Sequence, residues 1–301
     1  MLFRSDDQPV AVTGSDDGTV RIWDVNTGEQ IGEPLAGHDL WASTAACTLI
    51  EGRPVAVTGG DDGTVRFWDL SSREQIGKPL FGHASEVSSV ACTSIGGQPI
   101  AVTNSNDGSV WIWYLDGRKV LSKPLIGHGH GHPPDTASAV ACTFIGERPV
   151  AVTGGRDKTV RIWDLETRKQ IRKPLMGHSS EVTAVACISI SGRPVAVTGG
   201  RDRTVRIWDL IDHVQIGQPI TGHADDVSVV GCASFGGRPV AVTSALDRTV
   251  RIWDMTSRGE IARLVLPEQA CAVAITDDAS LIIGYGHEVA RFDRRRDRED
   301  L

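Results

Sequence analysis

Tryptophan recurs along this chain at an almost fixed interval, and this regularity restricts the possible folds more than any other feature. The interval is 45 residues, with a single interval of 50, and its members are Trp23, Trp68, Trp113, Trp163, Trp208 and Trp253. Asp follows each of them except Trp113. A chain of 301 residues is long enough for two ordinary domains. The repeat instead indicates a propeller or a solenoid.

Two further residue types follow the same interval. Gly-His pairs end at His38, His83, His128, His178 and His223, and cysteines recur in step at Cys47, Cys92, Cys142, Cys187 and Cys232. The segments 151–165 and 196–210 differ at a single position. The 33 Gly and 14 Pro are spread evenly, so turns are frequent and long helices have little room. These features predict an all-β repeat protein.

Each repeat contains the pattern of four short strands. In one repeat we expect strands at 87–94, 100–103, 109–114 and 119–125, with an Asn-Asp-Gly hairpin turn ending at Gly108. Four antiparallel strands make one blade. In the preceding repeat, Thr58 and Trp68 are each five residues from Gly63, so we expect these two residues to pair across neighbouring strands.

With Gly-His, a turn Asp and Trp-Asp recurring together, the sequence resembles the WD-repeat β-propeller family over nearly its whole length. The resemblance implies a hydrogen-bonded tetrad of His, Thr, Asp and Trp in each regular blade. Matched residue by residue, the tetrads are His38, Thr58, Asp62 and Trp68; His83, Thr103, Asp107 and Trp113; His128, Thr153, Asp157 and Trp163; His178, Thr198, Asp202 and Trp208; and His223, Thr243, Asp247 and Trp253.

Counting the strands that end at the six periodic Trp and at the degenerate Phe292-Asp293 gives a seven-bladed propeller of four-stranded antiparallel blades. The expected blades lie near 1–35, 36–80, 81–125, 126–175, 176–220, 221–266 and 267–293, followed by a charged tail at 294–301. The terminal blades are expected to be incomplete. Blade one has only residues 1–4 before its first turn, and the tail is too charged to supply an outer strand to blade seven. Side-chain packing alone is then expected to close the ring.

Three patterns resemble chemical sites, and each has a simpler interpretation. The Asp, His and Thr of a tetrad look like a catalytic triad, but a nucleophile needs one exposed copy, whereas this set is repeated in five blades. The six cysteines, Cys271 included, are expected to occupy equivalent places in first strands as small core residues. His128, His130 and His132 form a weak candidate metal site, because no carboxylate or Cys completes it. We therefore expect no catalytic residue, metal or cofactor.

The loops on one face of the propeller are the expected binding surface. Two Trp lie outside the repeat; Trp111 is expected to pack between blades, whereas Trp41 replaces an acidic residue of other blades and is expected to be an exposed anchor. Acidic or neutral residues flank the turn Asp in the first blades, and cations flank it in blades four to six. The candidate partner-binding residues are Asp16, Trp41, Asp61, Glu86, Asn106, Arg156, Lys158, Glu181, Arg201, Arg203, Asp226, Leu246 and Arg248.

Charge and hydropathy exclude several function classes. A net charge of −7 argues against non-specific binding to nucleic acid or to an anionic membrane. The apolar runs are too short for a membrane helix, and residues 1–7 do not form a secretory signal, so a cytoplasmic protein is expected. The sequence favours a non-enzymatic scaffold that binds a protein or peptide, acidic or phosphorylated, and no small-molecule substrate. A sensor or adaptor portion of a larger signalling protein and a propeller enzyme are the alternatives.

Overall fold

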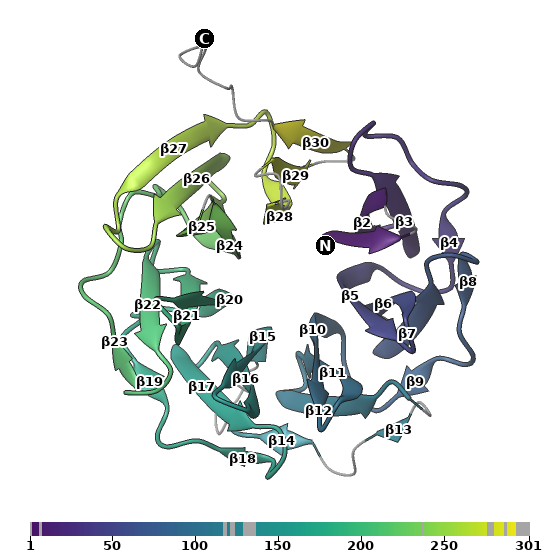
Figure 1. Ribbon diagram of the computed structural model, residues 1–301, viewed down its shortest axis with the longest axis horizontal. Coiled ribbons are helices and arrows are strands. Elements are labelled where there is room, and N and C mark those ends of the chain that lie inside the picture. The colour runs from purple at the N-terminus through teal and green to yellow at the C-terminus, as the bar shows by residue number, and fades with distance from the viewer. Residues whose placement is uncertain are drawn as a thin grey trace.

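Seven small antiparallel sheets form a ring around a central axis, in chain order (Figure 1). The structure is a computed structural model that describes residues 2–5, 8–116, 119–120, 124–128, 137–235, 237–275, 280–285 and 288–292. These residues contain strands and no helix, and thus no helix that could span a membrane. The all-β, seven-bladed propeller expected from the sequence is confirmed.

The first three blades each pair consecutive strands in hairpin order. Blade one contains β1 (Leu2–Ser5), β2 (Gln8–Gly14), β3 (Thr19–Asp24) and β4 (Leu35–Ala36). Blade two contains β5 (Ala42–Ile50), β6 (Arg53–Gly60), β7 (Thr64–Asp69), β8 (Glu74–Gln75) and β9 (Leu80–Phe81). Blade three contains β10 (Val87–Ile95), β11 (Gln98–Ser105), β12 (Ser109–Tyr114), β13 (Lys119–Val120) and β14 (Leu125–Ile126).

The remaining blades follow the same order around the ring. Blade four contains β15 (Ala137–Ile145), β16 (Arg148–Gly155), β17 (Thr159–Asp164), β18 (Lys169–Gln170) and β19 (Leu175–Met176). Blade five contains β20 (Val182–Ile190), β21 (Arg193–Gly200), β22 (Val205–Asp209) and β23 (Val214–Gln215). Blade six contains β24 (Val227–Phe235), β25 (Arg238–Ala245), β26 (Thr249–Asp254) and β27 (Glu260–Val265), and blade seven contains β28 (Ala270–Ile275), β29 (Leu281–Tyr285) and β30 (Glu288–Phe292).

The outermost strand of blade three is split, which corrects the single strand expected at 119–125. β13 pairs with the end of β12 and β14 pairs with its beginning. Blade two, in which the intervening residues are described, shows the reason. Between β8 and β9, Gly77 has a left-handed backbone (φ 65°) and Pro79 has no N–H to donate, so a regular ladder is interrupted there.

The hydrophobic core lies between neighbouring blades. One cluster joins Val152 and Ile162 of blade four to Val185, Trp208 and Leu210 of blade five, and equivalent clusters occupy the other interfaces. Because both faces of each sheet are covered by a neighbour, the strands of one blade do not show a clean apolar and polar alternation.

The ring closes between blades seven and one. Ala11, Val25 and Ile282 form a buried cluster against which Trp23 packs. Arg291 Nη1 also donates a hydrogen bond to Asn26 Oδ1 at 2.8 Å, so packing is not the sole link that the sequence analysis expected. Blade one has four strands, although β1 has 4 residues where β5 has 9, and blade seven has three strands among the described residues.

Candidate partner-binding face

Hydrogen-bonded tetrads fix the loops at one end of the propeller, which we call the top face. In blade five, Trp208 Nε1 donates to Thr198 Oγ1 at 2.8 Å, and the Thr198 hydroxyl lies 2.7 Å from His178 Nε2. The other imidazole nitrogen of His178 lies 2.9 Å from Asp202 Oδ2. With the proton on Nδ1, His178 donates to the carboxylate and accepts from the hydroxyl, so every buried polar group of the tetrad has a partner.

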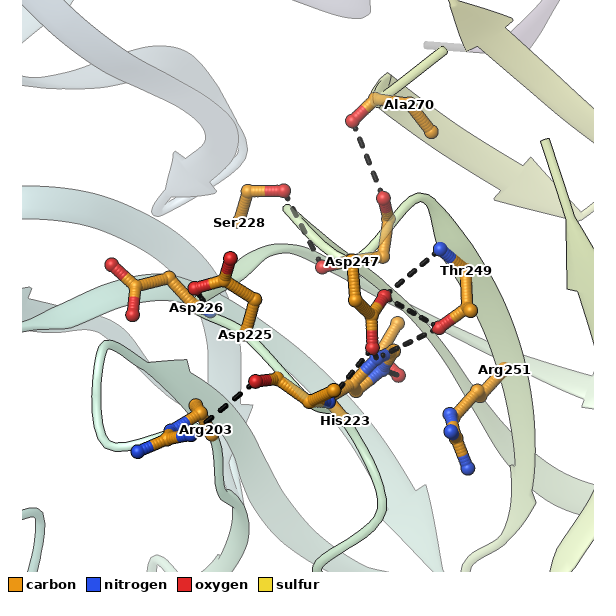
Figure 2. A network of polar contacts seen from close by, with 12 residues as sticks. Arg203, His223, Asp225, Asp226, Ser228, Asp247, Thr249, Arg251 and Ala270 are labelled. Atoms are coloured by element: carbon orange, nitrogen blue, oxygen red, sulfur yellow. Dashed lines mark hydrogen bonds and ion pairs between the residues drawn. The ribbon is translucent and has the colours of Figure 1, made fainter. Parts of the chain in front are cut away.

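The same contacts recur in the other regular blades. Thr58, Thr153 and Thr243 each link a Trp to a His, and those His contact Asp62, Asp157 and Asp247. Blade three departs from this pattern in one contact, because His83 Nδ1 lies 3.6 Å from Asp107. The contact of His83 Nδ1 with Ser109 Oγ at 3.1 Å matches that of His223 Nδ1 with Thr249 in blade six. Figure 2 shows the contact of His223 with Asp247 in blade six.

The strand register differs from the sequence expectation. Thr58 lies opposite Arg66, and Trp68 lies opposite Ala56, because the turn is centred at Asp62 and not on Gly63. The Trp68 indole reaches Thr58 diagonally across the ladder at 2.8 Å. The hydrogen bond therefore forms although the two residues are not directly paired.

The Gly of each Gly-His pair is required by close packing. A Cβ atom added at Gly177 would lie 2.9 Å from Cη2 of Trp208 and 2.8 Å from Nη1 of Arg206. Equivalent contacts with an indole ring occur at Gly37, Gly82, Gly127 and Gly222. The loop that carries the His thus lies directly against the Trp of its own tetrad.

The tetrads of blades two and six shift the pKa values of their His and Asp residues. Burial lowers the pKa of His38 and His223, against the opposite effect of Asp62 and Asp247. For Asp247, burial raises the pKa, but hydrogen bonds from Thr249 and from the Ala224 N–H outweigh it and bring the pKa to about 2. At neutral pH these His are therefore neutral and these Asp are ionised.

A second repeated contact was missed from the sequence. Arg206 Nη1 donates to Gln215 Oε1 at 2.6 Å, and Gln215 Nε2 donates to the Gly217 carbonyl at 2.6 Å. The sequence contained a signal for this contact, because an Arg two residues before the Trp recurs with a Gln or Glu seven residues after the Trp. The described pairs are Arg66 with Gln75, Arg161 with Gln170, Arg206 with Gln215 and Arg251 with Glu260.

Blade three has Trp111 and Val120 at these positions. Trp111 stacks on Trp113 there with ring centroids 5.8 Å apart, and it packs against the core between blades two and three.

Three cations on the top face adopt a backbone that favours glycine. Lys158, Arg203 and Arg248 follow the turn Asp of blades four, five and six and have φ values of 66°, 63° and 60°. Gly18, Gly63 and Gly108 occupy the equivalent positions in blades one to three. All three cations are exposed, and Arg203 lies beside the blade six tetrad, where it donates to the Ala224 carbonyl at 3.3 Å (Figure 2).

Two other cations of this half are neutralised by carboxylates. Glu181 Oε1 lies 3.3 Å from Arg156 Nε and accepts a hydrogen bond from Ser138 at 2.9 Å, and Glu181 Oε2 lies 3.0 Å from Arg201 Nε. Arg201 also lies 3.9 Å from Asp226. From the sequence, Arg156 and Arg201 were expected to add to the positive charge of this half. Because carboxylates pair with both, the three cations of this half without an ion-pair partner among the described residues are Lys158, Arg203 and Arg248.

The opposite half of the top face is acidic and apolar. Leu40 and Trp41 are 56 % and 54 % exposed, on the loop that enters blade two. Asp16 is exposed on the neighbouring turn, and Asp61 donates its backbone N–H to the Trp41 carbonyl and accepts from Ser43. Glu86 accepts a hydrogen bond from Asn106 in blade three. Leu246 is also exposed, but it lies on blade six in the half that carries the cations.

The cysteines and histidines outside the tetrads form no metal-binding cluster among the described residues. All six cysteines are free; Cys47 is buried, and burial raises the pKa of its thiol to about 11. Cys271 does not occupy the place expected for it, because the register puts it at the bulge position of Ser228 and leaves it exposed. His130 and His132 lie outside the described residues, and within those residues no three His, Cys, Asp or Glu are grouped to hold a metal.

These features define a class of protein: a β-propeller of repeated four-stranded blades that presents loops on a rigid ring. The profile of the WD40 family, described as WD domain, G-beta repeat, matches residues 4–24, 30–69, 74–114, 123–164, 168–209 and 215–254. The chain therefore belongs to the WD40 repeat family. Members of this family typically act as protein-interaction scaffolds and are generally non-enzymatic. No curated protein matches the chain.

Proposed function

We propose that this propeller is a non-enzymatic scaffold whose top face binds an acidic or phosphorylated segment of another protein. The observation that carries the proposal is the left-handed backbone of Lys158, Arg203 and Arg248. A residue with a Cβ in this conformation costs about 1 kcal/mol relative to glycine, and blades one to three avoid the cost with glycine at the same place. Cations retained on strained positions of three consecutive blades are well placed to bind anionic groups.

The tetrads support this function by holding the cationic turns rigidly. Asp202 accepts hydrogen bonds from Thr204 and from the Ser179 N–H, so it ties the turn of Arg203 to the loop that enters blade five. A rigid surface loses little conformational entropy when a partner binds. Trp41, on the other half of the face, supplies an apolar anchor for the same partner.

Replacing the three cations by glycine tests the proposal without straining the fold. The variant Lys158→Gly/Arg203→Gly/Arg248→Gly should be at least as stable as the parent, since each backbone is relieved of its strain. Its affinity for an acidic peptide and for the same peptide bearing phosphoserine should fall about tenfold or more, with a weaker dependence on salt. Fluorescence anisotropy measures both effects.

Arg53→Ala is the matched control, because it removes an exposed cation from the opposite end of the propeller. It should leave peptide binding unchanged. Affinity purification with mass spectrometry from the native cell should then recover partners with the parent and the control but not with the triple variant. Equal binding by the parent and the triple variant contradicts the proposal.

A further inference from the structure

A groove on the outer rim between blades four and five differs from the other described interfaces of the ring. It has a volume of about 540 Å³, within the range of ligand-binding clefts. One wall is the segment from Arg172 to Met176, which leads into and forms β19, and the other is the segment from Asp212 to Gln215 around β23. Trp208 contributes to the lining.

Two positions that bridge this interface carry different residues from those found at two other interfaces of the ring. Between blades one and two the Arg73 guanidinium lies over Gly32, and between blades five and six the Arg258 guanidinium lies over Gly217. Between blades four and five the glycine position is Arg172 and the arginine position is His213. Each donates across the interface, Arg172 Nη1 to the Asp212 carbonyl at 3.2 Å and His213 Nε2 to the Lys173 carbonyl at 3.0 Å.

The His at the arginine position has one ring nitrogen, Nδ1, without a hydrogen-bond partner among the described residues. Because His213 Nε2 carries the proton that bonds to Lys173, Nδ1 has a free lone pair, and it is buried with no partner in the described part of the chain. Desolvation, together with nearby Arg172, lowers the pKa of His213, so its imidazole is neutral at neutral pH. The fixed positive charges of the groove therefore belong to Arg172 and Lys173.

Apolar side chains flank these charges. Met176 is 72 % exposed on one wall, and Val214 is 53 % exposed on the other. The groove between blades five and six, with a volume of about 430 Å³, has Thr221 and Gly259 at the equivalent positions. Large apolar groups exposed side by side with cations are typical of a contact surface.

The positive charge of this groove exceeds that of the next groove around the ring, although Lys78 occupies the position of Lys173 between blades two and three. Lys173 is exposed and has no ion-pair partner among the described residues, whereas Gln218 takes its place in the next groove. Asp212, the one carboxylate in the lining, is paired with Arg193. An occupant with a carboxylate would therefore meet uncompensated positive charge here.

We propose that the rim groove between blades four and five binds an extended segment of another protein in which an acidic side chain stands next to a large apolar one. The acidic side chain pairs with Lys173, and the apolar side chain packs between Met176 and Val214. This surface is separate from the top face and does not depend on the function proposed for it. A partner held at both surfaces gains affinity through a raised effective concentration.

A double substitution that introduces the residues of two other interfaces tests the proposal. Arg172→Gly/His213→Arg introduces the pair found at two other interfaces, so it should fold and narrow the groove. Lys173→Glu reverses the charge, and Gln218→Glu introduces a carboxylate at the equivalent position of the neighbouring groove as a control. The probe is a short labelled peptide with alternating Glu and Leu or Phe, compared with versions that carry Lys for Glu or Ser for the apolar residues.

The acidic and apolar peptide should bind the parent about tenfold more tightly than either comparison peptide. Binding should weaken about tenfold, with unchanged melting temperatures, in each of three rim variants: Lys173→Glu, Met176→Ser/Val214→Ser and Arg172→Gly/His213→Arg. Gln218→Glu should change it less than about twofold, and Lys173→Glu should cause the same loss in the parent and in the top-face variant Lys158→Gly/Arg203→Gly/Arg248→Gly. The inference is overturned if the Lys peptide binds equally well, or if the rim variants bind like the parent.

Discussion

His178 Nδ1 lies 2.9 Å from Asp202 Oδ2, and the two side chains are only 0 % and 4 % exposed. This contact joins the loop that enters blade five to the turn that carries Arg203. Its burial places it among the structural elements of the propeller, because no substrate could reach the imidazole.

Asp202→Ala should destabilise the fold by about 1–3 kcal/mol, because it leaves the His178 N–H and the Ser179 and Thr204 donors without their acceptor. Trp208→Ala should cost at least as much, since it also empties part of the core. Denaturant unfolding measures both changes. Asp202→Asn keeps an acceptor oxygen and should cost less; a stability equal to that of the parent in Asp202→Ala would contradict the role assigned to the tetrad.

Gly177→Ala should destabilise the protein by about 1–3 kcal/mol, because the new methyl group would overlap Trp208 and Arg206. Gly259→Ala is the control, since its nearest neighbour would be Ser257 Oγ at an ordinary 3.5 Å and its backbone is not left-handed. Thermal unfolding of the two variants should show a lower melting temperature only for Gly177→Ala. Equal melting temperatures would show that the loop yields without cost.

The folding stability should fall in two steps as the pH is lowered. The pKa of His38 and His223 is below 6.5 in the folded state, so the unfolded state binds protons first and stability is lost as the pH falls below about 6.5. The pKa of Asp247 is about 2 when folded, so its contribution is present above the unfolded pKa near 4 and is lost as the pH falls toward 2. Melting temperatures across this range measure both steps, and His38→Asn/His223→Asn should flatten the first one. A slope unchanged in that variant would assign the step to other groups.

Trp41→Ala and Leu40→Ala should leave the stability within about 0.5 kcal/mol of the parent, because both side chains are more than half exposed. Trp41→Ala should weaken partner binding at every salt concentration, as loss of an apolar anchor does. Leu49→Ala, an equally exposed site at the other end of β5, is the control and should bind normally. Titration of the purified partner at low and high salt separates this effect from that of the cations. Normal binding by Trp41→Ala would place the anchor elsewhere.

Hydrogen exchange should be fastest in blades one and seven. Blade seven has three strands among the described residues, and β1 has 4 residues, so fewer backbone hydrogen bonds hold these sheets. Blades four and five, with complete inner strands and covered faces, should exchange most slowly. Mass spectrometry of peptides from each blade measures the rates, and uniform protection around the ring would be inconsistent with the closure described above.

The period of Trp, Gly-His and Asp predicted the regular blades and their tetrads, because each regular blade pairs its buried His, Thr and Trp within one repeat. His178, Thr198, Asp202 and Trp208 all lie within a single unit of the sequence. The split of the outermost strand and the register of Thr58 were not predicted correctly, since both depend on where a short turn places its centre.

Which surface charges are ion-paired becomes visible when the blades are assembled. Arg156 and Arg201 belong to different blades and meet on Glu181. No periodic pattern shows that these two are ion-paired while Lys158 has no ion-pair partner in the described part of the chain. The rim groove likewise depends on Arg172 and His213, which each donate a hydrogen bond to a backbone carbonyl across the interface between two blades. Residues within one blade are placed by local strand geometry, which the sequence pattern reflects. Contacts between blades depend in addition on the distance and angle between complete sheets. This distance and this angle are set when all the blades pack together in the closed ring.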